Sequence, residues 1–412
     1  MARGAGKMKE KEKITMKKSL SMLLAGAMLV GTLAGCGGGS NAATTDNSGT
    51  EENTATGTAF KIGGTSPLTG DAAIYGNAVK NGAELAVQEI NAEGGDIQFE
   101  VHFEDDQGQP DLAANAYAAL KDWGMQLSLG AVTSKPGEAI APLHQEDHIF
   151  ALTPSASSEA NVENNDVVFQ MCFTDPNQGL ASADYIADQQ LGTKIGIIYQ
   201  SDEVYSVGIR DTFVEEAEAK GLDIVVEQTF TADNRNDFSV QLNACRDAGA
   251  DLLFLPIYYT PASLILTQAN QMGYAPKIFG VDGMDGILTV ENFDTTLAEG
   301  VMLLTPFNAD ATDEATVNFV TKYEEAYGET PNQFAADAYD CIYAYKLALE
   351  TAGCTPDMSA SELCDKMIET FPTITFEGLT GDGAGITWDS NGAVSKSPKG
   401  MVIENGAYVG MD

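Results

Sequence analysis

Small hydroxyl-bearing residues gather in three short segments of this 412-residue chain, and each segment follows an apolar run. The segments are 66–70 (SPLTG), 133–134 (TS) and 153–157 (TPSAS). Hydroxyl groups and the N–H groups at a helix start can together hold a carboxylate without a cationic side chain. Helix capping uses the same residue types and is the simpler interpretation of any single segment. The three segments together make a carboxylate-binding site a hypothesis.

The second half of the chain offers complementary groups. Tyr205 follows the apolar run 194–199, Tyr258 ends another such run, and Asp282 follows a third. An acid at a strand end is a good partner for an ammonium group, and a tyrosine can donate a hydrogen bond while its ring walls a pocket. Singly, each of these residues could also be an ordinary loop residue.

Motifs of common enzyme classes are missing from the sequence, including G-x-S-x-G, a Walker loop and H-E-x-x-H. His144 and His148 have the spacing of one helix face, but no third metal ligand is evident, so a solvated helix end is favoured. Asp105 and Asp106 are expected to cap or shape the approach to a helix that begins at Pro110. We therefore expect no enzyme activity, no cofactor and no metal.

From residue 60 onward, short β-rich runs alternate with helical periodicity. This alternation predicts βαβ units and parallel sheets, and it continues too long for one sheet. The fold class is therefore α/β, with two doubly wound βαβ lobes. The expected strands are 60–64, 97–104, 127–132, 149–152, 167–172, 194–199, 224–230, 252–257 and 277–280. The expected helices are 75–92, 110–122, 136–145, 180–190, 207–220, 238–248 and 262–272.

The last hundred residues change character: helices are expected at 315–327, 332–352 and 359–370, followed by strand and turn over 386–408. We expect the helices to pack on the first lobe and the final strands on the second. The chain would then cross between lobes near 172–175, 305–308 and 377–381. Lobe 1 would comprise 59–174 plus 307–379, and lobe 2 would comprise 175–306 plus 380–412. Three crossings form a hinge, and the cleft between the lobes is the expected ligand site.

The amino-terminal sequence has the features of an export signal. A basic pair at residues 17–18 precedes an apolar run over 20–30, which is too short to span a bilayer, and the stretch Leu33–Cys36 (LAGC) follows. This box resembles the bacterial lipoprotein signal, in which the cysteine receives a lipid. We predict a signal peptide over 1–35, with Met16 as an alternative start, and a lipidated Cys36 with a flexible linker over 36–58.

The net charge excludes two classes of binding partner, and the positions of the cysteines predict which of them are buried. The net charge of −38 repels nucleic acid and anionic headgroups, so we exclude both as functional partners. Cys172 and Cys341 lie in apolar stretches and are expected to be buried as small hydrophobic residues. Cys354 and Cys364 flank a loop, and whether they form a disulfide is left open.

Seven segments carry a family resemblance. They occur in family order and cover nearly the whole chain after the linker: KIGGTSPLTGDAAIYG, NGAELAVQEINAEGG, FEDDQGQP, TPSASSEAN, ADYIAD, IYYTPASLILTQANQMGY and FGVDGMD. Residues from 59 to about 405 resemble the leucine/isoleucine/valine-binding protein family. The resemblance implies a type I periplasmic fold and a solute receptor for an ATP-driven (ABC) amino-acid importer.

The resemblance also implies how a ligand carboxylate is held. Ser134 would bind it, Ser155 through its backbone, and Ser157 through its N–H and hydroxyl groups. Many members have Thr in place of Ser157, so this chain keeps the contact without a methyl wall. Lys135 departs from the small residues common in the family, and it would either strengthen anion binding or point to solvent.

On the cationic side, the resemblance assigns the α-ammonium group to Tyr258 and Asp282. Some members have Glu in place of Asp282, and the shorter side chain here would shift the ligand or admit a water. Tyr75 and Tyr205 resemble the aromatic walls of the side-chain pocket.

These observations predict an extracytoplasmic receptor that captures an apolar, branched-chain amino acid for an ABC permease. We expect a monomer, anchored by lipid to the outer face of the cell membrane, with a Gram-positive envelope favoured. The alternatives are the same fold with another solute, such as an amide, urea, a small peptide or an aromatic acid, or a ligand sensor. Asp282 separates amino acids from neutral amides because it favours a cationic group.

Overall fold

The computed structural model describes residues 59–381 and 383–411. The predicted signal peptide, the lipidated Cys36 and the linker lie outside the described residues. Within the described ranges, no helix combines the length and apolar character needed to cross a membrane.

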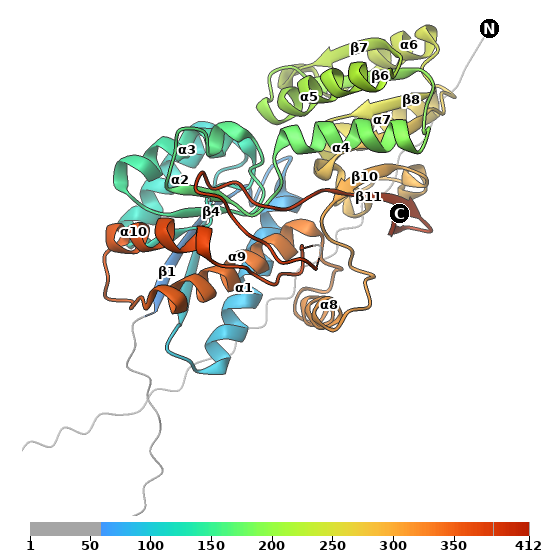
Figure 1. The fold of residues 1–412 in the computed structure, drawn as a ribbon. Helices are drawn as coiled ribbons and strands as arrows, with labels where there is room; N and C mark the ends of the chain where they lie inside the picture. Colours follow the sequence, from blue (N-terminus) through green and yellow to red (C-terminus); the bar gives the residue numbers. More distant parts are fainter. Residues whose placement is uncertain (1–58, 382, 412) are drawn as a thin grey trace, which may run out of the picture. The chain divides into compact units, whose positions relative to one another are not determined.

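The first sheet has five parallel strands in the order β2-β1-β3-β4-β5. β1 pairs along its whole length with β2, and α1 and α2 return the chain to the sheet as predicted for βαβ units (Figure 1). The carboxyl ends of β1, β3 and β4 lead into the three hydroxyl-rich segments. The strands are β1 (Phe60–Ser66), β2 (Phe99–Asp105), β3 (Leu127–Ser128), β4 (Ala151–Thr153) and β5 (Val168–Gln170).

The second sheet has seven strands in the order β12-β11-β10-β9-β8-β6-β7. β6 to β10 run parallel, and the antiparallel hairpin of β11 and β12 extends the sheet beyond β10. The final strands therefore join the second sheet, as predicted. β10 was not expected. The strands are β6 (Ile195–Gln200), β7 (Ile224–Phe230), β8 (Leu252–Leu255), β9 (Lys277–Gly280), β10 (Met302–Thr305), β11 (Lys399–Glu404) and β12 (Ala407–Gly410).

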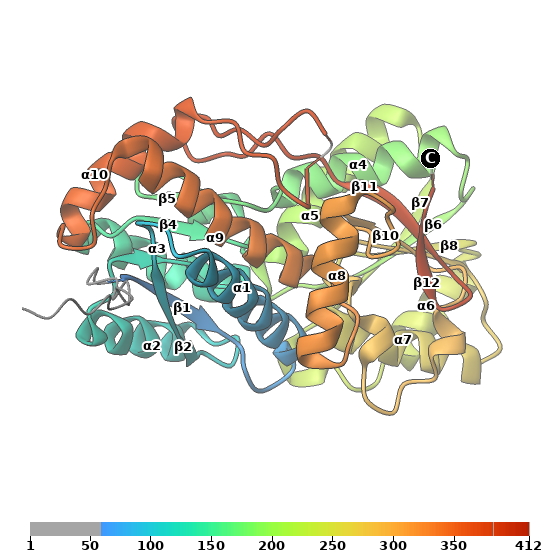
Figure 2. The ribbon, with the colours of Figure 1, turned by 90° about the horizontal axis from the view of Figure 1, so that it is seen from below.

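Helices cover these sheets. α1 and α9 pack side by side against the first sheet, and α8 lies against α1 (Figure 2). α4 and α5 form the closest helix pair of the second sheet. The helices are α1 (Ala73–Glu93), α2 (Pro110–Trp123), α3 (Ser134–Asp147), α4 (Asp175–Asp188), α5 (Val204–Lys220), α6 (Ser239–Ala248), α7 (Tyr259–Gln271), α8 (Glu314–Tyr327), α9 (Gln333–Ala352) and α10 (Ala360–Thr370). Short 3₁₀ turns complete the described chain: η1 (Glu159–Asn161), η2 (Ala232–Asn234), η3 (Asp282–Met284), η4 (Ile287–Thr289), η5 (Thr295–Ala298) and η6 (Phe371–Thr373).

Local sequence signals explain several helix ends. Pro110 occupies the first turn of α2, where its missing N–H costs no hydrogen bond. The side chain of Asn332 accepts a hydrogen bond from Ala335 N–H and caps α9. Ser359 and Glu362 form a reciprocal capping box at α10.

The chain passes between the two sheets three times. The first passage lies between β5 and α4, and the second between β10 and α8, close to the predicted positions. The third differs from the predicted 377–381. Trp388 Nε1 still donates to Gln170 O at 2.8 Å, and Gly392 O accepts from Gln170 N at 3.0 Å, so this segment remains on β5. The passage follows it, just before β11.

A buried ion pair holds this third passage. Lys396 is 5% exposed, and its Nζ donates to Asp337 Oδ1 on α9 at 2.6 Å and to Thr380 Oγ1. Burying a lysine is costly unless such partners satisfy it. The pair therefore ties the passage to α9.

All five cysteines in the described residues are free. Cys354 and Cys364 are both buried but unbonded, which answers the question that the sequence left open. Cys172 and Cys341 are buried as predicted.

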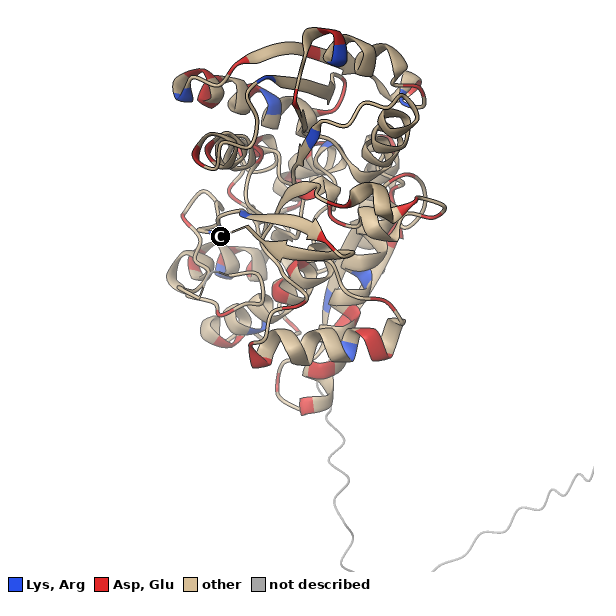
Figure 3. Cartoon of the chain, turned by 90° about the vertical axis from the view of Figure 1, so that its right-hand side faces the viewer, with Lys and Arg blue, Asp and Glu red and all other residues tan. Residues whose placement is uncertain are grey.

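Residues coloured as Asp or Glu occur throughout the cartoon of Figure 3 and are more frequent than those coloured as Lys or Arg. This distribution matches the net charge of −38.

Candidate functional site

Tyr75 lies at the start of α1, where the first sheet meets residues of the second. Its hydroxyl donates to Gly283 O and accepts from Tyr259 N–H at 3.2 Å. The ring centroid lies 4.3 Å from that of Phe334 and 4.8 Å from that of Tyr259. Tyr75 is thus a buried aromatic wall that contacts both halves of the molecule.

Tyr205, Tyr258 and Asp282 come together at the carboxyl ends of β6, β8 and β9. The rings of Tyr205 and Tyr258 stack with centroids 4.7 Å apart. The Tyr205 hydroxyl donates to Asp282 Oδ1 at 2.5 Å and accepts from Gly283 N–H at 2.9 Å. A Cβ atom at Gly283 would lie 2.6 Å from the Tyr205 hydroxyl, so glycine is required for this close approach.

Burial sets the protonation of this group. Asp282 is 4% exposed, and burial raises its pKa to about 7, against the opposing hydrogen bonds from Tyr205 and Gln178. Burial also raises the pKa of Tyr75, Tyr205 and Tyr258 well above the usual value. The three tyrosines are therefore neutral hydrogen-bond donors, and Asp282 is the group that titrates near neutral pH.

The predicted serines form a second group at the start of α3 and in the segment after β4. Ser134 is the first residue of α3, and its Oγ accepts from Ser158 N–H at 3.1 Å, which leaves its hydroxyl proton to donate. Ser155 Oγ donates to Val132 O at 2.6 Å. Ser157 is fully buried, and its Oγ has no partner that meets hydrogen-bond geometry among the described residues, although the Asp175 side chain lies beside it.

The beginning of α4 links the two groups. Asp175 N–H donates to Ser157 O at 3.0 Å, and Gln178 Oε1 accepts from Asp282 N–H at 3.0 Å. Asp175 and Gln178 are three residues apart and so share one face of the helix. The start of α4 thus contacts both the segment of Ser157 and the segment of Asp282.

Sequence reasoning missed these two α4 residues. Both are buried, and neither Asp175 Oδ1 nor Gln178 Nε2 has a partner that meets hydrogen-bond geometry in the described part of the chain, although Ser157 lies beside Asp175 and the Asp282 carboxylate beside Gln178. Burial raises the pKa of Asp175 well above its usual value, while Ser157 lowers it. The available signal was a pair of polar residues, three apart, directly after a predicted crossing between lobes.

Lys135 and Glu203 add charge at the edge of the site. Lys135 Nζ donates to Asp202 O at 2.8 Å, so this side chain reaches from α3 to the loop before α5. Burial raises the pKa of Glu203 to about 7, and Lys135 lowers it. The lysine therefore contacts the opposite half of the molecule, an outcome outside the two considered from sequence.

The remaining candidates have other partners. The two nitrogens of His144 contact Ile140 O and Ser128 Oγ, and His148 pairs with an aspartate of α10 at 2.8 Å. Over residues 59–381 and 383–411, no three His, Cys, Asp or Glu side chains are placed to hold a metal ion. Asp105 accepts from the N–H groups of Leu68 and Gln107, and Asp106 Oδ1 accepts from Gly108 N–H, so the two acids shape the segment after β1 and the approach to α2, one of the two predicted roles.

Comparison with known proteins decides the family. The profile of the periplasmic binding proteins matches residues 59–397. The chain belongs to this family. The members of this family are extracytoplasmic solute receptors of transporters, and the family is not a family of enzymes.

Individual relatives agree. A Leu/Ile/Val-binding protein homolog from Brucella melitensis is 28% identical over 80% of this chain and 89% of its own length. The isoleucine-bound substrate-binding protein LivJ of Streptococcus pneumoniae is 27% identical, with a TM-score of 0.77 over 85% of this chain and 98% of that one. The leucine-binding protein LivK of Thermotoga maritima is 26% identical, with a TM-score of 0.76 over 86% of this chain and 98% of that one. This periplasmic binding protein thus has the type I fold predicted from its sequence.

Proposed function

We propose that the protein captures a branched-chain amino acid between its two lobes and delivers it to an ABC permease. The observation that carries this proposal is that a buried carboxylate, Asp282, and a buried hydroxyl, Ser157, both lie against the start of α4. One group suits an ammonium ion and the other a carboxylate. The names of the relatives support an amino acid with an aliphatic side chain.

The carboxylate end has three donors. Ser134 and Ser157 would donate from their hydroxyl groups. The Ser155 hydroxyl is already used by Val132 O, which is consistent with a contact through its backbone. The start of α3 adds the partial positive charge of a helix N-terminus.

The ammonium end would lie against Asp282 and Tyr258. Tyr75 and Tyr205 would form the walls of the side-chain pocket, and both rings are buried in the described structure. Because both charged ends of the ligand leave water, each must be paired for binding to be favourable.

The anchoring and lobe assignments complete the proposal. A lipid on Cys36 and the linker to residue 58 would hold the receptor at the outer face of the membrane. Lobe 1 would contain the first sheet, and lobe 2 the second, with the three passages as a hinge. Closure about the hinge would present the loaded form to the permease.

Calorimetry with leucine tests the role of Asp282. Asp282→Ala should weaken binding by about 2–5 kcal/mol, because the buried ammonium group loses its charged partner. The matched control is Asp247→Asn, which changes an exposed aspartate in the last turn of α6 and should bind leucine like the natural protein.

Unchanged leucine affinity in Asp282→Ala would refute the assignment. The same titration with benzoate, urea and a dipeptide separates the alternatives. If benzoate or urea bound more tightly than leucine, that compound would replace the amino acid as the proposed ligand.

A further inference from the structure

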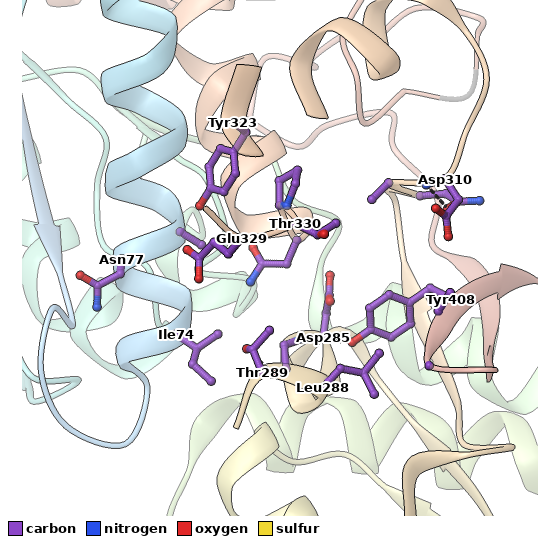
Figure 4. Close-up of a pocket in the computed structure, with 18 of the residues that line it drawn as sticks. Ile74, Asn77, Asp285, Leu288, Thr289, Asp310, Tyr323, Glu329, Thr330 and Tyr408 are labelled. Atoms are coloured by element: carbon purple, nitrogen blue, oxygen red, sulfur yellow. Dashed lines mark hydrogen bonds between the residues drawn. The ribbon is translucent and has the colours of Figure 1, made fainter. Parts of the chain in front are cut away.

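A separate cavity of about 520 Å³ opens between the start of α1, the segment carrying η3 and η4, the loop before α9, and the β11–β12 turn (Figure 4). None of the predicted ligand-binding residues lines it. Its volume lies within the range of small-molecule sites. The cavity therefore has the size of a binding site of its own.

Asp285 is a buried acid in its wall. The residue is 2% exposed, and its Oδ2 accepts from Gln333 N–H at 2.9 Å. Its Oδ1 has no partner with hydrogen-bond geometry in the described part of the protein, although Tyr408 lies beside it. In Figure 4 the Asp285 side chain rises from the segment of Leu288 and Thr289 toward the opposite wall. Gln333 N–H and the Tyr408 hydroxyl are both uncharged, so the buried carboxylate lacks a cationic partner and a cationic ligand that pairs with it is favoured.

The other lining groups define the charge of that ligand. Glu329 and Asp310 also line the cavity, and no lysine or arginine within 59–381 and 383–411 does. Burial raises the pKa of Asp285 to about 6, against the Gln333 N–H and Tyr408, so its carboxylate is mostly ionised at neutral pH. The cavity therefore favours a cation.

The shape of the wall favours an organic cation over a metal ion. The three carboxylates do not form a metal-holding group within the described residues. Ile74, Leu288 and several alanines supply apolar surface between the polar groups. A ligand with a charged end and a hydrocarbon body would use both kinds of surface.

We propose that this cavity is a second binding site, for a small aliphatic ammonium ion. The ammonium group pairs with Asp285 Oδ1, and the hydrocarbon chain packs against Ile74 and Leu288. Glu329, which is exposed, contributes a weaker, longer-range attraction.

Titration calorimetry with n-butylamine, a cation at neutral pH, tests the proposal on the purified protein. The amine is titrated into the natural protein and into Asp282→Asn, in which the proposed amino-acid site is impaired. Both should bind it, and n-butanol and butyrate should bind to neither. Because leucine is absent, the result does not depend on the proposed amino-acid function.

Asp285→Asn should weaken amine binding by at least about thirtyfold, the effect of removing one partner from a buried charge pair. Ala309→Phe, which adds a ring to the cavity lining and leaves Asp285 unchanged, should also weaken amine binding, and serves if Asp285→Asn does not fold. Asp247→Asn is again the matched control. The proposal would be overturned if Asp282→Asn alone lost amine binding, or if the cavity variants bound the amine as tightly as the natural protein. It would also be overturned if n-butanol bound as tightly as the amine, or if the natural protein bound no amine.

Discussion

Burial has two opposing effects on the Asp282 side chain. It strengthens attraction for an ammonium group, because little water screens the charge. It also raises the pKa of Asp282 to about 7, because the carboxylate loses hydration. The hydroxyl of Tyr205 favours the ionised form and partly offsets that loss. The charge that would bind the ligand is therefore available only when the pH is near or above neutral.

Leucine affinity should fall as the pH decreases from about 8 to about 5, approaching a tenfold loss per unit below the pKa of Asp282. Leucine itself remains a zwitterion over this range, so the change reports the protein. Calorimetry at several pH values measures it.

Asp282→Asn should weaken binding and flatten the pH profile, because the titrating carboxyl group is gone. A profile as steep as that of the natural protein would show that another acid, such as Asp175 or Glu203, controls the affinity.

At the scale of elements, the paired helices α1 and α9 position Tyr75 and the ring that packs on it. α1 begins beside Tyr75, and α9 begins with Gln333 and Phe334, whose ring contacts Tyr75. The helices approach closely at Gly82, where an added Cβ atom would lie 2.0 Å from Ala335 O. Only glycine allows this spacing, since the obstructing atom belongs to the backbone of the other helix.

Gly82→Ala should lower the free energy of unfolding by about 1–3 kcal/mol, the usual cost of overpacking, despite the better helix propensity of alanine. Urea denaturation followed by circular dichroism measures this change. Gly95→Ala is the control, because no atom lies within 4 Å of its added Cβ. Equal stability of the two variants would contradict the close contact between the helices.

At the scale of the whole molecule, the negative net charge and the buried acids both lower the stability of the folded protein as the pH rises. Burial raises the pKa of Asp106, Glu203 and Asp282 to about 7, and of Asp285 and Asp337 to about 6. Such an acid binds its proton more tightly in the folded chain than in the unfolded one. Its contribution to stability is therefore present at low pH and is lost as the pH rises through the folded-state pKa. Self-repulsion from the net charge of −38 also grows as acids ionise.

The ligand-free protein should accordingly be more stable at about pH 5.5 than at about pH 7.5. His144 acts in the opposite direction, because burial lowers its pKa to about 4, but it is one group against five acids. Urea denaturation midpoints at the two pH values check the expected order. A higher midpoint at the higher pH would show that other interactions in the folded chain offset the cost of ionising the buried acids.

Local pattern was enough to predict most elements. The strands at 224–230 and 277–280 match the structure at both ends. Pro110 marked the start of α2, because proline suits the first helical turn. A short apolar run does not by itself distinguish a strand from other buried structure, so 277–280 was predicted as a strand and β10 was missed. Pairing with β9 and β11 identifies β10 as a strand.

The sequence by itself determined the α/β class and the family, and it singled out the serines, tyrosines and Asp282 as candidates, since these depend on local periodicity and on residue types at strand ends. Only the tertiary structure decided which other residues lie between these candidates. Asp175 and Gln178 matter because α4 starts between the two sheets, and Trp388 keeps its segment on β5. Burial, pKa shifts and the cavity at Asp285 likewise arise from contacts between residues far apart in the chain, which no local pattern encodes.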